Sequence, residues 1–280
     1  MPSAARVRVT ATDGIPTRPR VAASAEEVRT RTLMAMTRQI ACADGIASLG
    51  RILTIWAHPD DESYLSGALM AMARANGQSV TCIVATPGDH ADTEADRARI
   101  RSVRTGELAG ALRILGVDDM VVLGIRDGEC QGFDDDRATT MIGAVIRNRQ
   151  PDTIVTFGAD GFTGHPDHRA VSRWVTDAIA ATNPTVRLLH SAMTPAMADD
   201  GLDIDARFGV FDAGLPAVYD PHDLALCVPV DGQWLDTKLR ALRAHRSQTA
   251  AIIDEVGEER YRRWISAEVF IDARTNRGSY

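Results

Sequence analysis

The chain has 280 residues, of which 45% are hydrophobic and 25% charged, as in an ordinary globular protein. This length suits one α/β domain with a well-buried core. The formal net charge of −7 argues against a general affinity for nucleic acid or anionic membranes, because both require a basic surface.

The sequence also has features that bear on its cellular location. No apolar run approaches the roughly twenty residues of a membrane span, and no apolar stretch typical of a signal peptide follows the N-terminus. The four cysteines lack the C-x-x-C spacing of a zinc ribbon. Cys82 and Cys227 fall in apolar, strand-like runs, where we expect reduced core thiols. We therefore expect a cytoplasmic protein.

The N-terminal region differs in pattern from the rest. Residues 1–22 contain three prolines and no periodicity, which predicts a loose arm. The Ser-x-x-Glu pattern from Ser24 to Glu27 is typical of a capping box and predicts a helix that ends near Ala43. We assign residues 1–48 to this arm and helix, and residues 49–280 to the main domain.

From residue 51 onward, short apolar runs alternate with segments of helical periodicity. The apolar runs predict strands over 52–57, 80–85, 120–123 and 153–157. The periodic segments predict helices that end before Asn76-Gly77 and at Gly116, a helix from Thr139 to Arg147, and another that begins near His168. Such alternation indicates an α/β fold: a Rossmann-like, mostly parallel sheet with helices on both faces.

The C-terminal third has a weaker pattern. It predicts strands over 186–190 and 225–228, and helices from Leu235 and from Glu258. We interpret this part as a C-terminal elaboration of the sheet.

Two loops that follow predicted strands are rich in metal-binding residue types. Ala57-His58-Pro59-Asp60-Asp61-Glu62 follows the first strand, and Gly164-His165-Pro166-Asp167-His168 follows the fourth. In open parallel sheets, ligands bind outside the carboxyl ends of the strands. The two loops therefore share one cleft if their strands lie near each other.

The spacing within these loops suits a catalytic zinc site, which takes three protein ligands and keeps one position open. His58 and Asp61 lie three residues apart, so that one turn can bring both to the same ion, and a third ligand would come from the second loop. Adjacent side chains diverge, which leaves Asp60 free to act as a base.

A purely structural interpretation of these loops also exists. Asp60, Asp61 and Asp167 are all suitable residues for a helix N-terminus, where they cap the helix or favour its dipole. One such loop would be ambiguous. Two loops, each between a predicted strand and a helix, favour the metal site.

Together the two loops resemble the motifs of the LmbE/PIG-L family of zinc-dependent de-N-acetylases. The resemblance extends from about Arg51 to Phe270, so that the main domain is expected to be the deacetylase domain and the N-terminal segment lies outside it. Weaker similarities are Arg104-x-x-Glu107-Leu108, Arg126-Asp127-Gly128 and a late helix over 238–248 that contains His245.

The resemblance implies roles for individual residues. His58, Asp61 and His168 would bind Zn²⁺, Asp60 would be the general base, and His165 would face the substrate carbonyl. In many members of the mycothiol branch, a tyrosine lies two residues before that histidine, where this chain has Thr163. Either His165 and zinc alone stabilise the oxyanion that forms from the substrate carbonyl, or the space that a tyrosine would fill accepts a bulkier substrate.

Two further residues are candidates for substrate binding. Arg104 would bind a hydroxyl or phosphate group, although arginines at helical spacing (Arg97, Arg101, Arg104) often form a solvated face. Asp127 would accept a sugar hydroxyl, although it also suits a turn before Gly128. His245 is expected to be structural.

The expected function is removal of an N-acetyl or N-acyl group from a small-molecule amino-sugar conjugate, by a chain that can form a homo-oligomer. The alternatives within enzymes are an amidase of a thiol conjugate and a deacylase of a glycopeptide antibiotic. A non-catalytic sugar-binding protein is a third, against which Asp60 argues because a binding module needs no base. No G-x-G-x-x-G follows the first strand, so a nucleotide-binding protein lacks support.

Overall fold

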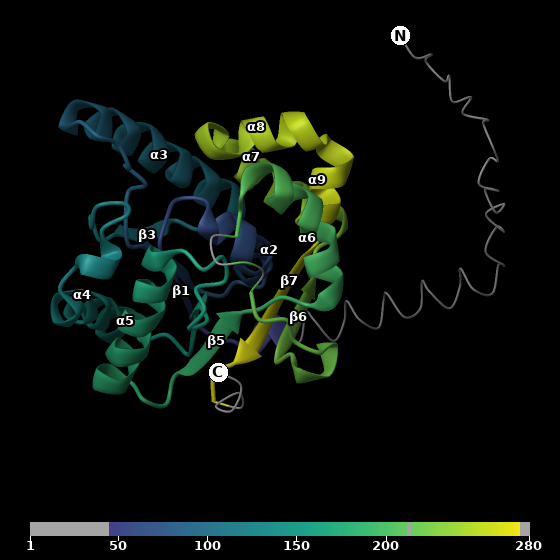
Figure 1. The fold of residues 1–280 in the computed structure, drawn as a ribbon. Coiled ribbons are helices and arrows are strands. Elements are labelled where there is room, and N and C mark those ends of the chain that lie inside the picture. Colours follow the sequence, from purple (N-terminus) through teal and green to yellow (C-terminus); the bar gives the residue numbers. More distant parts are fainter. Residues whose placement is uncertain (1–44, 212–213, 215, 275–280) are drawn as a thin grey trace, which may run out of the picture. The chain divides into compact units, whose positions relative to one another are not determined.

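The computed structural model describes residues 45–211, 214 and 216–274 (Figure 1). The predicted N-terminal arm and its helix lie outside the described residues. In the described part, the strands are β1 (Ile52–Trp56), β2 (Val80–Val84), β3 (Asp119–Val122), β4 (Thr153–Phe157), β5 (Arg187–Ser191), β6 (Leu226–Pro229) and β7 (Ala267–Asp272). They form one sheet in the order β3-β2-β1-β4-β5-β7-β6.

The helices are α2 (Asp61–Ala75), α3 (Glu94–Leu115), α4 (Asp135–Arg149), α5 (Pro166–Thr182), α6 (Pro195–Phe208), α7 (Gly232–Ala244), α8 (Arg246–Val256) and α9 (Glu258–Trp264). Short 3₁₀ turns lie at Cys130–Gly132 and Pro221–Asp223. Helices α2, α3 and α7 pack together on one face of the sheet, and α4 packs with α5 on the other (Figure 1). The predicted α/β class is therefore confirmed.

The first five strands are parallel, as predicted, and every residue of β1, β2 and β4 is buried. Helices on both faces explain this, because a strand covered on each side has no face exposed to solvent. Aromatic side chains complete the centre of the core: Trp56 at the end of β1 packs edge-to-face on Phe157 at the end of β4, with ring centroids 4.9 Å apart.

The boundaries of some elements differ from the prediction. Helix α4 begins at Asp135, four residues before the predicted start, because the Asp134 side chain accepts a hydrogen bond from the N–H of Arg137 and caps it. The sequence pattern did not predict α6, α8 or β7. Strand β7 runs antiparallel to both β5 and β6, so the C-terminal elaboration extends the sheet.

The expectation for the cysteines is only partly correct. Cys82 on β2 is a buried thiol, as predicted. Cys227 is exposed, so its assignment to the core is wrong. It lies on β6 at the edge of the sheet, where Leu226 and Val228 take the buried face and the residue between them points the other way.

None of the helices in the described residues is long and apolar enough to span a membrane.

The only lysine of the chain is part of a fully buried ion pair. Lys238 Nζ on α7 lies 2.9 Å from Glu268 Oε1 on β7. The same carboxylate accepts hydrogen bonds from the backbone N–H groups of Ala68 and Leu69 in α2, each 2.8 Å long. The pair therefore ties β7 to two helices on the same face of the sheet.

This pair leads to a prediction about stability. Lys238→Met should lower the free energy of unfolding by about 3–5 kcal/mol, because it leaves the Glu268 carboxylate buried without its cation. Urea denaturation measures the change. The double variant Lys238→Met/Glu268→Gln should recover part of it, since no charge is then buried.

As a control, Arg243→Met removes the half-exposed pair with Glu258 and should cost at most about 1 kcal/mol. A Lys238→Met variant as stable as this control would contradict the prediction.

Candidate metal centre and active site

The two predicted metal-binding loops lie side by side because β1 and β4 are neighbours in the sheet. The strands pair in parallel, with Ile52 opposite Thr153, and the strand order reverses between them. Each loop leads into a helix, α2 after β1 and α5 after β4. The loops therefore meet at the topological switch point, where open α/β sheets bind ligands.

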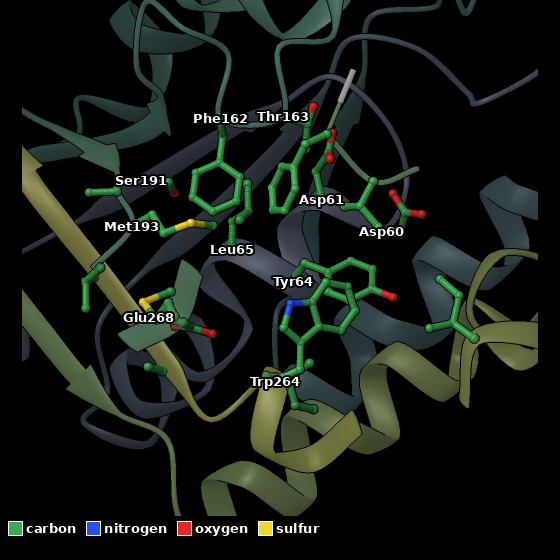
Figure 2. Close-up of a pocket in the computed structure, with 18 of the residues that line it drawn as sticks. Asp60, Asp61, Tyr64, Leu65, Phe162, Thr163, Ser191, Met193, Trp264 and Glu268 are labelled. Carbon is green, nitrogen blue, oxygen red and sulfur yellow. The ribbon is translucent and has the colours of Figure 1, made fainter. Parts of the chain in front are cut away.

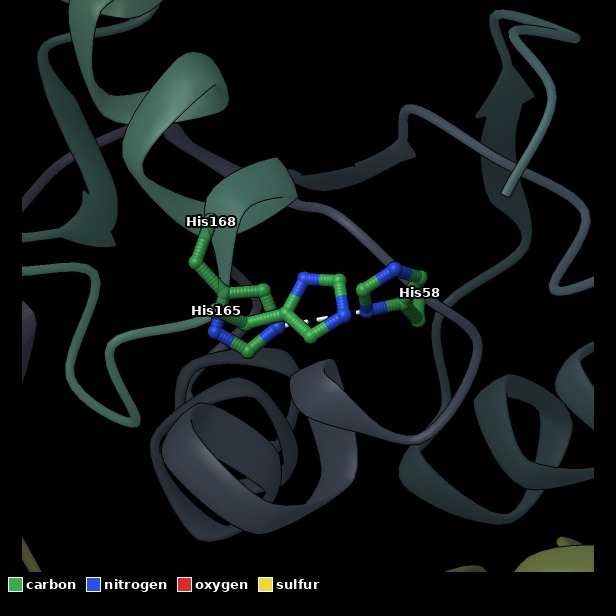
Figure 3. A group of neighbouring side chains, drawn as sticks. All are labelled: His58, His165 and His168. Atoms are coloured by element: carbon green, nitrogen blue, oxygen red, sulfur yellow. Dashed lines mark hydrogen bonds between the residues drawn. The ribbon is translucent and has the colours of Figure 1, made fainter. Parts of the chain in front are cut away.

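The three predicted metal ligands lie close together at this point. His58 Nδ1 lies 3.2 Å from His168 Nε2 and 3.6 Å from Asp61 Oδ2, and His168 Nε2 lies 3.5 Å from Asp61 Oδ1. Figure 3 shows the rings of His58 and His168 facing each other, with His165 beside them. Two imidazole nitrogens and a carboxylate at these separations form a donor set that suits Zn²⁺.

The nitrogen of His168 that points away from this centre is also occupied. His168 Nδ1 faces the carbonyl oxygen of Gly161 at 2.9 Å and Thr163 Oγ1 at 3.1 Å. Phe157 stacks on the ring, with centroids 4.1 Å apart. Burial lowers the pKa of His168 to about 4. The ring is thus neutral, as a metal ligand must be, and held with Nε2 toward the centre.

The ring of His58 is held by two carboxylates that the sequence did not assign to it. His58 Nε2 lies 3.1 Å from Asp127 Oδ1 and 3.2 Å from Asp167 Oδ2. A carboxylate on the outer nitrogen of a metal-binding histidine orients the ring and makes it a better ligand. This arrangement leaves Nδ1 of His58 for the metal.

The charge around His58 also favours a cation. Burial by itself would lower the pKa of His58, but the neighbouring carboxylates outweigh it and raise the pKa well above its ordinary value. Three carboxylates around one imidazole require positive charge. A divalent ion ligated by His58, Asp61 and His168 would supply it, so the residues present fit a metal.

Two other combinations of residues are also close enough for a metal. Nitrogen or oxygen atoms of His58, His165 and His168 lie within 4.8 Å of one another, as do those of His58, Asp127 and Asp167. In the second group, Asp167 already accepts backbone N–H bonds from Gly128 at 2.8 Å and Cys130 at 3.0 Å. Its carboxylate is therefore better placed to support His58 than to bind an ion.

Asp167 is one of the residues that the sequence analysis missed. We considered it only as a capping residue, but the cap of α5 is His165, whose side chain accepts the N–H of Asp167. The fully buried Asp167 carboxylate instead connects the loop after β4 to the 3₁₀ turn at Cys130–Gly132 and to His58. Its position within the His-Pro-Asp-His motif, next to His168, was the available signal.

Asp60 has a φ of 121°, a backbone conformation that residues other than glycine rarely adopt. Two contacts hold it there. The N–H of Asp60 donates to Glu62 Oε2 at 2.8 Å, and Arg104 Nη2 donates to the carbonyl of Pro59 at 2.7 Å. Strain of this kind persists only where the surroundings enforce it, and it is concentrated at functional sites.

The Asp60 carboxylate faces the guanidinium of Arg104. Arg104 Nη2 is 3.6 Å from Asp60 Oδ2. Burial raises the pKa of Asp60 to about 7, although the positive charge of Arg104 opposes the shift. A carboxylate with such a pKa is able to accept and return a proton near neutral pH.

Arg104 is not part of a solvated face, so that structural alternative is wrong. The side chain is buried, donates to the carbonyl of Gly88 at 3.1 Å, and lies 3.7 Å from Asp127 Oδ2. Gly88 has φ of +70°, and a Cβ atom there would lie 2.5 Å from the guanidinium. Arg104 therefore occupies a space that only glycine at position 88 leaves open.

Glu62 is a second residue that sequence reasoning missed. Its fully buried carboxylate accepts the N–H of Asp60 through one oxygen, and the other oxygen lies 2.7 Å from Nε2 of the buried His245. Although burial lowers it, the pKa of His245 is raised on balance by Glu62. His245 is thus structural, as expected, and supports the residue that holds Asp60.

His165 is oriented by its role at the start of α5. The N–H of Asp167 donates to His165 Nδ1 at 3.1 Å. With Nδ1 as acceptor, the proton of the ring is on Nε2, which makes His165 a hydrogen-bond donor through that atom. The ring packs edge-to-face on His58 at 4.8 Å between centroids, adjacent to the metal centre (Figure 3).

The remaining predicted site residues have identifiable positions. Asp127 supports His58 and also lines a polar cavity, so that its predicted contact with a sugar hydroxyl stays a prediction. The hydroxyl of Thr163 contacts His168 and not the open side of the centre. The stack with Phe157 and the contact with Thr163 thus hold the ring of His168.

Two cavities adjoin the centre and meet at Asp60 and Gln248. One, of about 600 Å³, is lined chiefly by polar and charged residues and is called the polar cavity below: His58, Asp60, Gly88, His90, Arg99, Ile100, Val103, Arg104, Asp127, Gly128, His165, Ser247 and Gln248. The other, of about 290 Å³, is mostly apolar and extends from Asp60 and Asp61 toward β7 (Figure 2).

The fold and the site together define an α/β protein in which a convergent His/Asp/His group that suits a metal lies at the switch point of the sheet, next to the strained Asp60. The PIG-L model, described as GlcNAc-PI de-N-acetylase, matches residues 53–179. The deacetylase of 1D-myo-inositol 2-acetamido-2-deoxy-α-D-glucopyranoside from Acidothermus cellulolyticus is 31% identical over 71% of this chain and 80% of its own. The chain belongs to the PIG-L family and is an amide-hydrolysing de-N-acetylase.

Other similarities agree with this assignment. The deacetylase of the same name from Streptomyces griseus is 35% identical over 71% of this chain and 75% of its own. The structure of N,N'-diacetylchitobiose deacetylase from Pyrococcus horikoshii superimposes with a TM-score of 0.58 and 22% identity, over 90% of this chain and 94% of that one. The similarity to the Pyrococcus horikoshii structure concerns the fold alone.

The geometry predicts how metal binding depends on single residues. Protein purified without chelator should contain about one divalent ion per chain. His58→Ala and His168→Ala should remove it, and Asp61→Asn should weaken it, because each change deletes a donor. Elemental analysis of the purified proteins measures the metal.

His222→Ala is the matched control, since His222 is exposed, and it should keep the ion. Retention of metal by both His58→Ala and His168→Ala would show that the ligands are different ones. Loss of metal from Asp60→Asn, but not from Asp61→Asn, would exchange the roles of the two carboxylates.

A second prediction concerns the strained Asp60. Glu62→Ala removes the acceptor of the Asp60 N–H and frees the backbone to relax, which should lower kcat by about a hundredfold, the scale of a 1 Å misplacement. The metal content should stay at the wild-type value. A variant that is inactive because it has lost the metal, or one with full kcat, would contradict the positioning role.

Proposed function

We propose that the protein hydrolyses the N-acyl amide of an amino-sugar conjugate of the 2-acetamido-2-deoxyglucose type, with Zn²⁺ bound by His58, Asp61 and His168. The observation that carries the proposal is the position of Asp60, a separately held carboxylate beside a convergent His/Asp/His group. The relatives named as deacetylases of an acetamido-glucose conjugate support the choice of substrate.

Zinc at this position supplies Lewis acidity, which polarises an amide carbonyl and makes a water molecule more acidic. The protein residues then manage the protons. Asp60 accepts a proton from the attacking water, and Arg104, held at 3.6 Å, stabilises the carboxylate for this role. Hydrolysis forms a C–O bond to the water oxygen and breaks the amide C–N bond.

His165 would stabilise the negative charge that develops on the carbonyl oxygen. Its Nδ1 is occupied by the N–H of Asp167, so that the Nε2–H is available to donate. A donor of this kind contributes about 3–4 kcal/mol to an acyl-transfer transition state. The proton that Asp60 has accepted passes to the leaving nitrogen, which departs as the amine.

The polar cavity suits the sugar. Its lining provides an acceptor, Asp127, and a donor, Arg99, for hydroxyl groups. A cytoplasmic location and self-association remain predictions that rest on the sequence alone.

The experiment uses the zinc-loaded protein and a panel of N-acetylglucosamine conjugates that differ in the aglycone. Wild-type protein should release acetate and free amine in equal amounts. Asp60→Asn should keep its zinc and lower kcat by roughly a hundredfold or more, as expected for loss of a general base. A non-catalytic sugar-binding protein would bind members of the panel but release neither product.

A further inference from the structure

The apolar cavity is larger than an acetyl group requires. It begins at Asp60, Asp61 and Thr163, and its walls include Phe162, Met193, Met197, Phe211, Ile252 and Trp264. Figure 2 shows Phe162, Leu65 and Trp264 facing the same space as Asp61. The cavity is thus continuous with the metal centre. When the amide of a substrate lies at that centre, one part of the substrate must lie next to the cavity.

An amide substrate has two ends, and the site has two cavities of opposite character. The amino sugar carries hydroxyl groups, which lose hydrogen bonds to water when they are buried and need polar partners. The polar cavity provides those partners. The acyl end carries only carbon and hydrogen beyond its carbonyl, which matches the other cavity.

We propose that the apolar cavity binds the acyl chain, and that the preferred substrates are N-acyl amino sugars whose acyl group is longer than acetyl. This inference rests on the proposed function and specifies its substrate class.

The volume sets the length of the chain. An apolar cavity of about 150 Å³ holds a benzene molecule, with six carbons. A cavity of about 290 Å³ therefore accommodates on the order of ten carbons. The methyl group of an acetyl substrate would leave most of that space without an occupant.

Phe162 and Thr163, which directly precede the second loop, lie where this cavity adjoins the metal centre. Thr163 is short, and its hydroxyl is turned to His168 at 3.1 Å. Phe162 takes φ of 61°, which places its side chain in the wall of the cavity. The short side chain at position 163 thus leaves space beside Asp61.

The remaining walls come from the C-terminal elaboration. Met197 lies on α6, Ile252 on α8, and Trp264 ends α9, while Ala267, Glu268 and Val269 belong to β7. These elements therefore have a role beyond completing the sheet.

The test is a series of N-acylglucosamines with acetyl, butanoyl, hexanoyl, octanoyl and tetradecanoyl groups, used below the concentrations at which they form micelles. The kcat/KM for amine release should rise by about fourfold per buried methylene, because each contributes about 0.8 kcal/mol. It should stop rising near ten carbons. A series that falls or stays level from acetyl to octanoyl overturns the proposal.

A pair of probes, each with one chain of eight carbons, separates the acyl chain from the aglycone. N-octanoylglucosamine carries its alkyl chain on the amide, and octyl N-acetylglucosaminide carries one on the glycosidic oxygen. The first should show the larger gain in kcat/KM over N-acetylglucosamine. A larger gain for the octyl glycoside would mean that the cavity binds the aglycone, which overturns the proposal.

Variants on one helix test the cavity itself. Met197→Trp fills it from α6 and should lower the octanoyl-to-acetyl ratio of kcat/KM at least tenfold. Leu202→Trp, at an exposed position on the same helix, should leave the ratio unchanged. Ile252→Trp fills the cavity from α8 and provides a second measurement if Met197→Trp does not fold.

The two levels of inference fail separately. Absence of amide hydrolysis from every substrate in the series would overturn the proposed function. Hydrolysis of the acetyl substrate without a gain for longer chains, or a ratio that neither filling variant changes, overturns only the assignment of the cavity.

Discussion

The parallel pairing of β1 with β4 is the constraint on which the site depends. These strands are separated by about one hundred residues of sequence, yet Ile52 lies opposite Thr153 at the point where the strand order reverses. Because α2 and α5 leave toward opposite faces, the loop before α2 and the first turns of the two helices present His58, Asp61 and His168 to one position. Neither loop alone has the donors for a catalytic metal, so the site exists only in the folded sheet.

A second constraint is electrostatic. Asp61, Asp127 and Asp167 are gathered around His58, where burial makes uncompensated negative charge costly. Backbone N–H groups, Arg104 and the proposed metal together balance the negative charge of these carboxylates. The same features orient the rings, so that charge balance and ligand geometry have one cause.

The region beyond β5 gives the site its second cavity. The antiparallel β7 extends the sheet next to β5 and supplies Glu268, whose buried pair with Lys238 fixes α7 on α2. Helices α6, α8 and α9 then enclose an apolar space that opens at Asp61. The chemistry of an amide hydrolase is thus combined with walls made of large hydrophobic side chains, which determine what the acyl end of a substrate can be.

The sequence by itself determined the α/β class, the parallel strands and the two loops, because hydrophobic periodicity and local spacing are properties of neighbouring residues. It also identified His58, Asp60, Asp61, His165 and His168 as the candidate site. Tertiary structure alone decided what supports them. Glu62 holds the strained backbone of Asp60, Asp167 supports His58 across 109 residues, and Arg104 fits against Gly88. Contacts over such sequence separations leave no periodic signal. The apolar cavity has the same origin, because its walls come from elements that only the fold brings together.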